Sequence, residues 1–177
     1  MIVYFDTSFL VKIYAMEDDS EAAQTMLSAA SAIVTSVVSY AELCSALARK
    51  RREGSVDETA YQAALRTFQT DWDGIGKMEV SEETARRAGD LARKHALRGF
   101  DAIHLASALL ISSGIKGGKL AFATADARLA RAAAQEGLAT HRDYGDATPG
   151  GMTVMERRQE GWKPAPRSRK SRRQPVK

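Results

Sequence analysis

Short runs of apolar and β-branched residues alternate along the chain with stretches whose apolar residues recur every three to four positions. The runs are typical of strands buried on both faces, and the stretches are typical of amphipathic helices. This alternation favours βαβ units and therefore an α/β fold, in which helices cover both faces of a mainly parallel sheet. We predict four or five strands, at residues 2–5, 32–38, 77–80 and 120–123 and, at an edge, 138–142.

Several of the predicted helices begin at residues that favour capping. Asp57, Ser81 and Asp126 each precede a stretch of helical spacing. Ser39 stands three residues before Glu42, which is the spacing of a capping box, so we expect Ser39 to cap its helix. A further helix, over residues 101–111, is almost wholly apolar and is predicted to be mostly buried, and another is predicted over residues 20–30.

The length and composition are those of a globular protein of one domain, or at most of two small ones. The chain has 177 residues, and its 44% apolar and 27% charged content excludes wholesale disorder. The single cysteine, Cys44, excludes an intramolecular disulfide framework and a multi-cysteine zinc site. No stretch approaches the roughly 20 apolar residues that span a bilayer, and the first residues lack the pattern of a signal peptide. We therefore expect a cytoplasmic protein without a membrane partner.

Basic residues are concentrated toward the C-terminal end. Residues 163–177 carry seven Lys and Arg residues and no acid, while the whole chain carries a net charge of +4, so the other residues together carry −3. We predict that residues 144–177 are an extension with a basic, disordered tail. This tail is either a solvated end or a contact for RNA phosphates, made in that case by Arg167, Arg169, Lys170, Arg172 and Arg173.

Four acidic residues occupy comparable places beside the predicted strands. Asp6 and Asp126 follow strands, Glu42 lies in the first helical turn after a strand, and Asp101 begins the apolar helix. Because the carboxyl ends of parallel strands meet at one edge of a sheet, where ligands bind, we expect these side chains to converge. Helix capping explains each acid when it is taken alone. Since a carboxylate can cap a helix and also bind a metal, both interpretations stay open.

Convergence of these carboxylates would require a counter-charge. Two unit charges 4 Å apart repel by about 4 kcal/mol at an effective dielectric constant of 20. Protonation would relieve this repulsion, but Mg²⁺ or Mn²⁺ would relieve it while every carboxylate stays ionised. Hydroxyls of Ser8 and Thr124 stand beside two of the acids. A metal held in this way can activate water for attack on a phosphodiester.

The acids lie within four short segments, which are Asp6-Thr7-Ser8-Phe9-Leu10, Ser39-Tyr40-Ala41-Glu42-Leu43, Phe100-Asp101-Ala102-Ile103-His104-Leu105-Ala106-Ser107-Ala108 and Thr124-Ala125-Asp126. In this order they resemble the four acidic motifs of PIN-domain ribonucleases, especially the VapC-type toxins of type II toxin–antitoxin pairs. The resemblance covers roughly residues 1–143, which we predict to be a PIN-like nuclease domain. It implies an α/β/α sandwich, cleavage of RNA with Mg²⁺ or Mn²⁺, homodimerisation and inhibition by a cognate antitoxin protein.

The same resemblance implies a role for each matching residue. Asp6 and Asp101 would be the main metal ligands, and Glu42 and Asp126 would complete the acidic pocket. Ser8 and Thr124 would be supporting hydroxyls. The basic residues beyond position 162 lie outside the family pattern.

Two other functions fit parts of the sequence. A non-catalytic RNA-binding or protein-interaction module could share the fold, with acids that serve only as caps. An aspartyl-phosphate phosphatase fits less well, because such enzymes commonly carry a second Asp where this chain has Ser8.

Three further features receive structural interpretations. His104 is expected to be a hydrogen-bonded structural histidine in preference to an RNA contact, and Lys50-Arg51-Arg52 to be the basic end of a helix. A surface for an antitoxin or a second protomer is placed on the first two helices, although core packing explains their apolar residues Phe9, Tyr14 and Met26 equally well.

Overall fold

Five parallel strands form the central sheet. In the computed structural model, which describes residues 1–15, 21–115 and 120–144, they are β1 (Ile2–Phe5), β2 (Ala32–Ser36), β3 (Gly76–Met78), β4 (Leu120–Ala123) and β5 (Ala139–Thr140). Their order across the sheet is β3-β2-β1-β4-β5, and every neighbouring pair is parallel. The predicted α/β class and the parallel sheet of five strands are confirmed.

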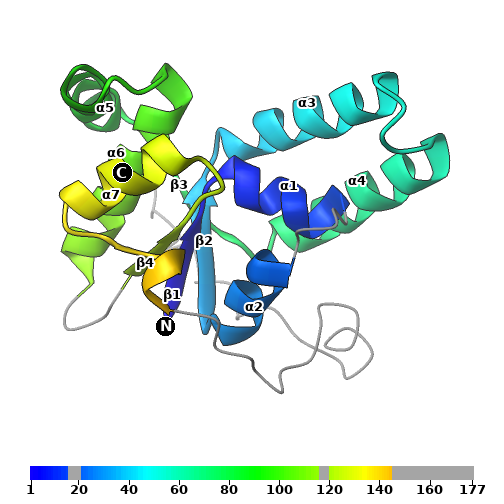
Figure 1. Cartoon of the computed structure of the whole chain (residues 1–177), viewed down its shortest axis with the longest axis horizontal. Helices are drawn as coiled ribbons and strands as arrows, with labels where there is room; N and C mark the ends of the chain where they lie inside the picture. The colour runs from blue at the N-terminus through cyan, green and yellow to red at the C-terminus, as the bar shows by residue number, and fades with distance from the viewer. Residues whose placement is uncertain (16–20, 116–119, 145–177) are drawn as a thin grey trace, which may run out of the picture.

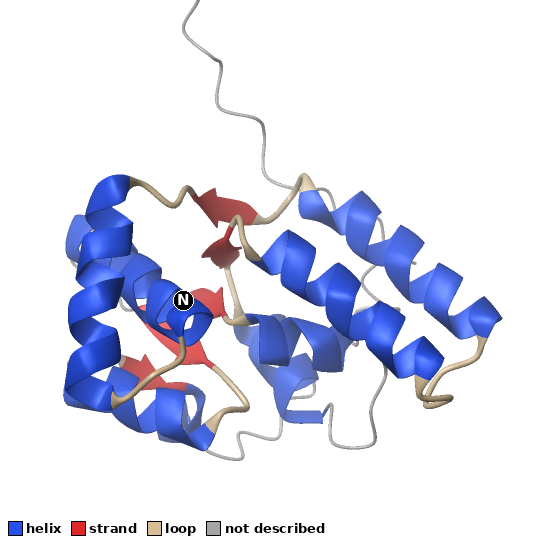
Figure 2. Cartoon of the chain, turned by 90° about the horizontal axis from the view of Figure 1, so that it is seen from above, coloured by secondary structure: helices blue, strands red, loops and turns tan. Residues whose placement is uncertain are grey.

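Helices cover both faces of this sheet (Figures 1 and 2). The buried side chains of the first four helices pack on one face of the sheet, and those of the last three pack on the other. The arrangement is the predicted α/β/α sandwich. The helices are α1 (Thr7–Ala15), α2 (Glu21–Ala29), α3 (Ser39–Arg52), α4 (Glu58–Trp72), α5 (Glu82–His95), α6 (Gly99–Gly114) and α7 (Ala127–Gln135), and a short 3₁₀ helix, η1 (His141–Tyr144), follows β5.

Alternate residues of β1 contribute to two separate hydrophobic cores. Val3 and Phe5 pack toward α1–α4, whereas Tyr4 packs toward α5–α7. All three are fully buried, which is why the strand is a continuous apolar run and shows no alternation of apolar and polar residues. Two apolar side chains from the first two helices, Phe9 and Met26, are at most 4% exposed and belong to the first core.

Tyr14 also lies in the first core, with an exposed fraction of 9%. The three apolar residues that the sequence offered for an exposed partner surface are therefore core residues. Hydrophobic burial alone accounts for their presence on α1 and α2.

The register of the three central strands determines where the next segments of the chain begin. Phe5 is paired with Ala123, and Tyr4 is paired with Val34. The backbone N–H of Asp6 continues this ladder by donating to the carbonyl of Ala123 at 3.0 Å. The segments that leave β1, β2 and β4 consequently start side by side at one edge of the sheet.

The start of α3 differs from its prediction. β2 ends at Ser36, two residues before the predicted end, and Val38 stands at the N-cap without a side-chain capping bond. Ser39 is the first helical residue, and its Oγ lies 2.6 Å from Thr35 Oγ1. The predicted capping box is wrong, because the Ser39 hydroxyl bonds to the end of β2 and Glu42 is held by other partners.

The other predicted helix starts hold with small shifts. Asp57 accepts from the backbone N–H of Ala60, and Ser81 accepts from that of Thr84. The buried helix α6 begins at Gly99, two residues before its predicted start. β3 begins at Gly76, where a Cβ would lie 2.9 Å from Val34 Cγ1, so close contact with β2 explains the glycine.

Two predictions concern regions beyond the sheet. In the three described segments, no helix is long and apolar enough to cross a membrane. The basic tail and its Arg and Lys residues lie outside the described residues, which end at position 144.

Candidate functional site

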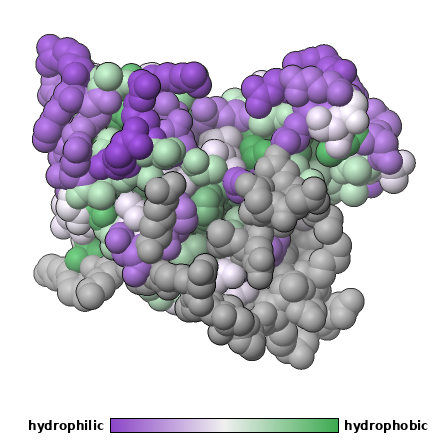
Figure 3. Space-filling model, in the orientation of Figure 1, coloured by the Kyte–Doolittle hydropathy of each residue, from purple (hydrophilic) through white to green (hydrophobic). Residues whose placement is uncertain are grey.

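The four acids stand where the carboxyl half of the sheet meets the helices. Asp6 connects β1 to α1, and Asp126 is the N-cap of α7, just after β4. Glu42 and Asp101 lie in the first turns of α3 and α6. The carboxyl ends of the central strands point toward the region between α3 and α5 (Figure 1), and the surface there is hollowed (Figure 3).

Asp6 is a buried carboxylate held by three donors. The residue is only 4% exposed. Oδ1 accepts from Ser8 Oγ at 2.7 Å and from the backbone N–H of Phe9 at 3.2 Å, and Oδ2 accepts from Thr124 Oγ1 at 2.7 Å. Burial raises the pKa of Asp6 above its ordinary value, although the charge of His104 and these hydrogen bonds oppose the rise.

The two supporting hydroxyls connect Asp6 to the segment that carries Asp126. Thr124 Oγ1 accepts from the backbone N–H of Asp126 at 3.0 Å, and Ser8 Oγ accepts from that of Ala125 at 2.8 Å. Asp126 itself caps α7, because its Oδ1 accepts from the backbone N–H groups of Arg128 and Leu129. Ser8 and Thr124 thus join Asp6 to the segment before Asp126, and their role as supporting residues stays a prediction.

Glu42 is held by a second hydrogen-bond network. Its Oε2 accepts from Thr7 Oγ1 at 2.6 Å and lies 2.8 Å from His104 Nε2. Burial alone would raise the pKa of Glu42, but the hydrogen bonds from His104 and Thr7 leave it below the ordinary value. The carboxylate form of Glu42 is thus stabilised by the protein itself.

His104 connects this network to the second core. Its Nδ1 lies 3.0 Å from the hydroxyl of Tyr4, and its residue is 2% exposed. Burial raises the pKa of Tyr4 well above its ordinary value, so the phenol keeps its proton and can donate to Nδ1. Nε2–H is then available to donate to Glu42. The expectation of a hydrogen-bonded histidine is confirmed, and its partner is one of the four acids.

Asp101 completes the electrostatic connection among the acids. Burial raises the pKa of Asp101, and the negative charge of Asp126 raises it further, while Arg98 and His104 act in the opposite direction. His104 also acts on the charge of Asp6. The charge of Asp126 thus acts on Asp101, and the buried imidazole acts on both Asp6 and Asp101.

The donor set at this edge has the chemistry of a hard-cation site. Carboxylate and hydroxyl oxygens are the ligands that Mg²⁺ and Mn²⁺ prefer. Asp6 and Asp101 both have raised pKa values, so a cation would offset a real cost of ionising them. Within the residues that the structure describes, no three His, Cys, Asp or Glu side chains form a ready-made metal-ligand group. The residues fit the metal by their chemistry and not by a preformed cluster.

Sequence reasoning missed the role of Thr7 and the acid that His104 contacts, which is Glu42. Thr7 follows Asp6 directly, yet its hydroxyl serves Glu42, which is 35 positions away. His104 lies three residues after Asp101 on a helix, a spacing that puts the two near one face and was the available signal. The basic end of α3 is structural as predicted, because Arg51 contacts Glu58 at 3.1 Å and the Tyr61 ring at 4.6 Å.

Comparisons with known proteins show the family of the chain. The family model for the PIN domain matches residues 3–135. Ribonuclease VapC45 and Ribonuclease VapC49, from two strains of Mycobacterium tuberculosis, are each 37% identical over 110 residues, which are 62% of this chain and 76% of the relative.

Solved structures share the fold at lower identity. FitAcB from Neisseria gonorrhoeae has a TM-score of 0.58 at 17% identity and covers 82% of this chain and 99% of that one. VapBC2 from Rickettsia felis, bound to a promoter DNA fragment, has a TM-score of 0.52 at 16% identity, and the match covers 79% of this chain and 97% of that one. A toxin–antitoxin complex from Klebsiella pneumoniae has a TM-score of 0.51 at 18% identity, and the match covers 70% of this chain and 86% of that one. The chain belongs to the PIN-domain family and, within it, to the VapC type.

Proposed function

We propose that this chain is a divalent-metal-dependent endoribonuclease and the toxin of a type II toxin–antitoxin pair. The observation that carries the proposal is the buried carboxylate of Asp6, fixed by Ser8 and Thr124 at the same sheet edge as three other acids. The relatives named as VapC ribonucleases support the activity, and the neighbour from Klebsiella pneumoniae, a toxin–antitoxin complex, supports the biological role.

The proposed roles follow from the donors around each acid. Asp6 and Asp101, whose pKa values are raised, are the main ligands for Mg²⁺ or Mn²⁺. Glu42 and Asp126 complete the acidic pocket and orient the attacking water. When bound, the ion lowers the pKa of a coordinated water and neutralises charge on the phosphodiester. Attack by water leaves a 5′-phosphate and a 3′-hydroxyl.

Ser8 and Thr124 act by orientation. Each hydroxyl donates to one oxygen of Asp6, so the carboxylate cannot rotate without losing a hydrogen bond. Each hydroxyl also accepts a backbone N–H of the segment that ends at Asp126. The two acids are therefore held in a fixed relation before RNA or metal binds, which is the preorganisation that catalysis requires.

The proposed partners are an RNA substrate, a second copy of the chain and a cognate antitoxin. A free ribonuclease of this kind would stop the growth of its host, so a neutralising protein is a functional necessity. Expression of the chain should arrest growth, and co-expression of the neighbouring open reading frame should relieve the arrest. Growth at the normal rate with the protein present at a high level would contradict the toxin role.

The activity is tested by RNA cleavage with purified protein. We expect cleavage with Mg²⁺ or Mn²⁺, no cleavage with excess EDTA, and no cleavage by Asp6→Asn or Asp101→Asn while the fold persists. Asp57→Asn is a matched control, since Asp57 is an exposed N-cap of α4 and asparagine caps equally well. Full activity of both site variants, or in EDTA, would exclude the mechanism.

A non-catalytic module remains the alternative that one observation favours, because Asp6 and Asp126 do hold N-terminal backbone N–H groups of α1 and α7. Thermal unfolding separates the two functions. A ligand that binds only the folded state at a hundred times its dissociation constant stabilises by about 2.7 kcal/mol. We expect Mn²⁺ to raise the Tm of the native chain and not that of Asp6→Asn, whereas caps alone would give no metal-linked rise.

A further inference from the structure

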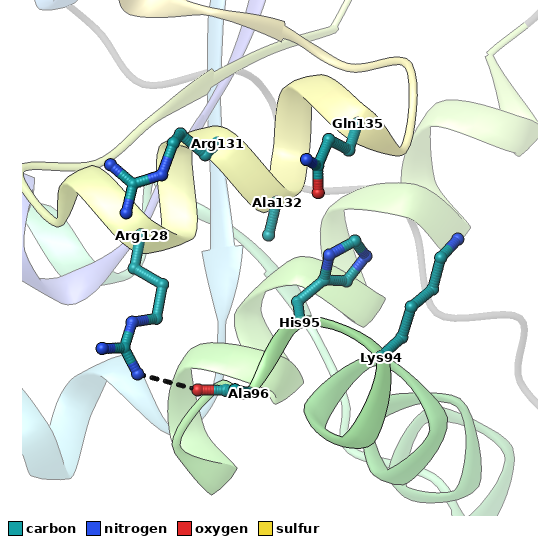
Figure 4. A pocket seen from close by; sticks show the side chains of 7 residues that line it. All are labelled: Lys94, His95, Ala96, Arg128, Arg131, Ala132 and Gln135. Atoms are coloured by element: carbon teal, nitrogen blue, oxygen red, sulfur yellow. Dashed lines mark hydrogen bonds between the residues drawn. The ribbon is translucent and has the colours of Figure 1, made fainter.

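A basic cavity lies on the α5–α7 side of the molecule, next to the acidic edge. Its volume is about 390 Å³, and it opens between the C-terminal end of α5 and the outer face of α7 (Figure 4). Lys94 and His95 line it from α5, and Arg128, Arg131 and Gln135 line it from α7. The surface over α5 is strongly hydrophilic (Figure 3).

The cavity carries an excess of positive charge. Lys94, Arg128 and Arg131 line it, and none of the described lining residues is an acid. Glu136 contacts two of the lining residues, since its Oε1 lies 2.8 Å from Lys94 Nζ and 2.6 Å from His95 Nε2. Arg131 makes no hydrogen bond or ion pair with the described residues. Its guanidinium is therefore available to an anion from outside.

A strained backbone residue holds one side of the cavity in place. Ala96, the C-cap of α5, has φ 52° and ψ 44°, a left-handed conformation that residues other than glycine rarely adopt. Its carbonyl accepts from Arg128 Nη1 at 3.0 Å, which bridges α5 and α7. The bond uses one of the five N–H donors of Arg128, so the guanidinium is positioned while its other donors stay available. A left-handed residue is a common end for a helix, and here it directs the Ala96 carbonyl toward Arg128.

The cavity and the acidic edge share helix α7. Asp126 caps this helix, and Arg128 and Arg131 follow on the next turns. At a rise of about 1.5 Å per residue, Arg131 begins about 7.5 Å beyond Asp126 along the helix axis. A chain whose phosphodiester lies at the acids can therefore extend its next phosphates onto these cations. Guanidinium groups match phosphate oxygens with paired, parallel N–H donors.

We propose that this cavity is a phosphate subsite, in which Arg128, Arg131 and Lys94 hold the RNA backbone beside the bond that is cut. The inference rests on the proposed ribonuclease function and adds to it the place where the strand leaves the acids. An acidic protein segment is the competing ligand. RNA is favoured because the cations lie on the helix that Asp126 caps, so that one strand can contact both sites.

The test measures the affinity of a single-stranded oligouridine of about twelve nucleotides, within the usual span of such sites. Binding is measured in EDTA, which prevents cleavage, at several salt concentrations. We expect Arg131→Ala to weaken binding about threefold to tenfold and to reduce the log–log salt slope by about 0.7, the share of one phosphate contact in a single strand. Arg131→Glu should weaken binding more.

Arg66→Ala is the matched control. Arg66 is exposed on α4, which lies on the opposite side of the molecule from α5 and α7 (Figure 1), and its loss removes the same charge. Its affinity and salt slope should stay close to those of the native chain. Equal effects of Arg131→Ala and Arg66→Ala would overturn the subsite, because they would show a contribution of net charge alone.

Two outcomes separate the subsite from the ribonuclease. Native protein that cleaves RNA, with Arg131→Ala binding like the control, would overturn the subsite and leave the activity standing. Native protein that binds but never cleaves, with weaker binding by Arg131→Ala, would support the subsite and overturn the activity. If Arg131→Ala loses affinity for an oligoglutamate peptide and keeps it for oligouridine, the cavity binds an acidic protein segment and the RNA proposal is wrong.

Discussion

Asp6 and Glu42 lie at the ends of neighbouring strands, yet the protein treats their charges in opposite ways. Asp6 is buried and its pKa is raised by that burial, in spite of three hydrogen bonds. Glu42 keeps a side chain that is 27% exposed, and hydrogen bonds from His104 and Thr7 outweigh its partial burial, so its pKa is lowered. The fold stabilises the charge of Glu42 through its own hydrogen bonds, whereas burial keeps the charge of Asp6 costly.

The opposite pKa shifts of Asp6 and Glu42 explain how one edge of a sheet can be both stable and reactive. The network of Tyr4, His104 and Thr7 around Glu42 Oε2 connects α6 to β1, α1 and α3. The three hydrogen-bond donors to Asp6 fix the direction of the carboxylate, but together with His104 they do not outweigh the effect of burial. We therefore expect metal binding and catalysis to depend most on Asp6, and folding to depend more on the contacts of Glu42.

The largest expected effect is on cleavage by Asp6→Asn. Asparagine keeps the shape of the side chain and loses the charge that would hold the ion. We expect a loss of at least about a hundredfold in kcat/KM, within the range of general acid–base and metal-assisted effects, and a smaller loss for Glu42→Gln. Steady-state cleavage of one RNA under saturating Mn²⁺ measures both. Equal losses in the two variants would break the contrast between the sites.

The next effect is on stability and concerns His104. Replacing it by Leu leaves the hydroxyl of Tyr4 and the carboxylate of Glu42 without their partner, and one unsatisfied buried polar group costs about 1–3 kcal/mol. We expect a fall of that size in the free energy of unfolding, measured with urea. His104→Gln, which retains hydrogen-bonding capacity, should recover part of it.

A double-mutant cycle assigns this loss to the contact. The free energies of unfolding of His104→Leu, Glu42→Gln and the double variant should be non-additive by about 0.5–3 kcal/mol, the range for residues in one network. Additive effects would show that His104 stabilises through packing alone. The Glu42 side of the contrast would then lose its structural basis.

A smaller effect is expected at Thr124, on the Asp6 side. Thr124→Val keeps the volume and removes the donor to Asp6 Oδ2 and the acceptor of the Asp126 N–H. The variant should lose about 1–2 kcal/mol of unfolding free energy, about 1 kcal/mol for each hydrogen bond, and should cleave RNA more slowly. Thr124→Ser keeps the hydroxyl and should behave nearly as the native chain. A Val variant with native activity would remove the orienting role.

The sequence was sufficient for the sheet and for the Asp6 side of the site. Both rest on local patterns, since Asp6 follows a buried apolar run and is two residues from Ser8, and Asp126 caps the helix after β4, a neighbour of β1 in the sheet. A parallel sheet has its strand ends at one edge, so these positions follow from the order of the elements. The family model over residues 3–135 agrees with that interpretation.

The Glu42 side could not be predicted in the same way. The spacing of Ser39 and Glu42 fits a capping box, yet both side chains bond across the fold, Ser39 to Thr35 and Glu42 to His104. The partners His104 and Glu42 are 62 positions apart, so only the packing of α6 beside α3 reveals them. Tertiary contacts override the local preference for a capping box here, because they give hydrogen-bond partners to buried polar groups that the capping box would leave without them.

The cavity between α5 and α7 could not be predicted at all. It depends on a left-handed conformation at Ala96, which a sequence normally indicates by a glycine. It depends also on the hydrogen bond from Arg128 to the Ala96 carbonyl, between residues 32 positions apart. Arg131 alone gives no sequence pattern of a phosphate site.

The smallest expected effect is the pH dependence of stability, and it has opposite signs for the two acids. The folded-state pKa of Asp6 lies above 3.8, its ordinary value, so the folded protein binds more protons than the unfolded chain as pH rises from acid toward neutral. Stability at this site is therefore lost as pH rises through the folded pKa, and in EDTA Asp6→Asn should gain stability over the native chain toward neutral pH.

The folded-state pKa of Glu42 lies below 4.5, so its contribution is present above that value and is lost as pH falls through the folded pKa. Glu42→Gln should accordingly be less stable than the native chain at neutral pH and converge with it in acid. Urea unfolding of the three proteins between about pH 3 and about pH 7 measures both trends. If the two variants shift in the same direction at neutral pH, the fold does not distinguish the charges of Asp6 and Glu42, and the division of the site into two halves is wrong.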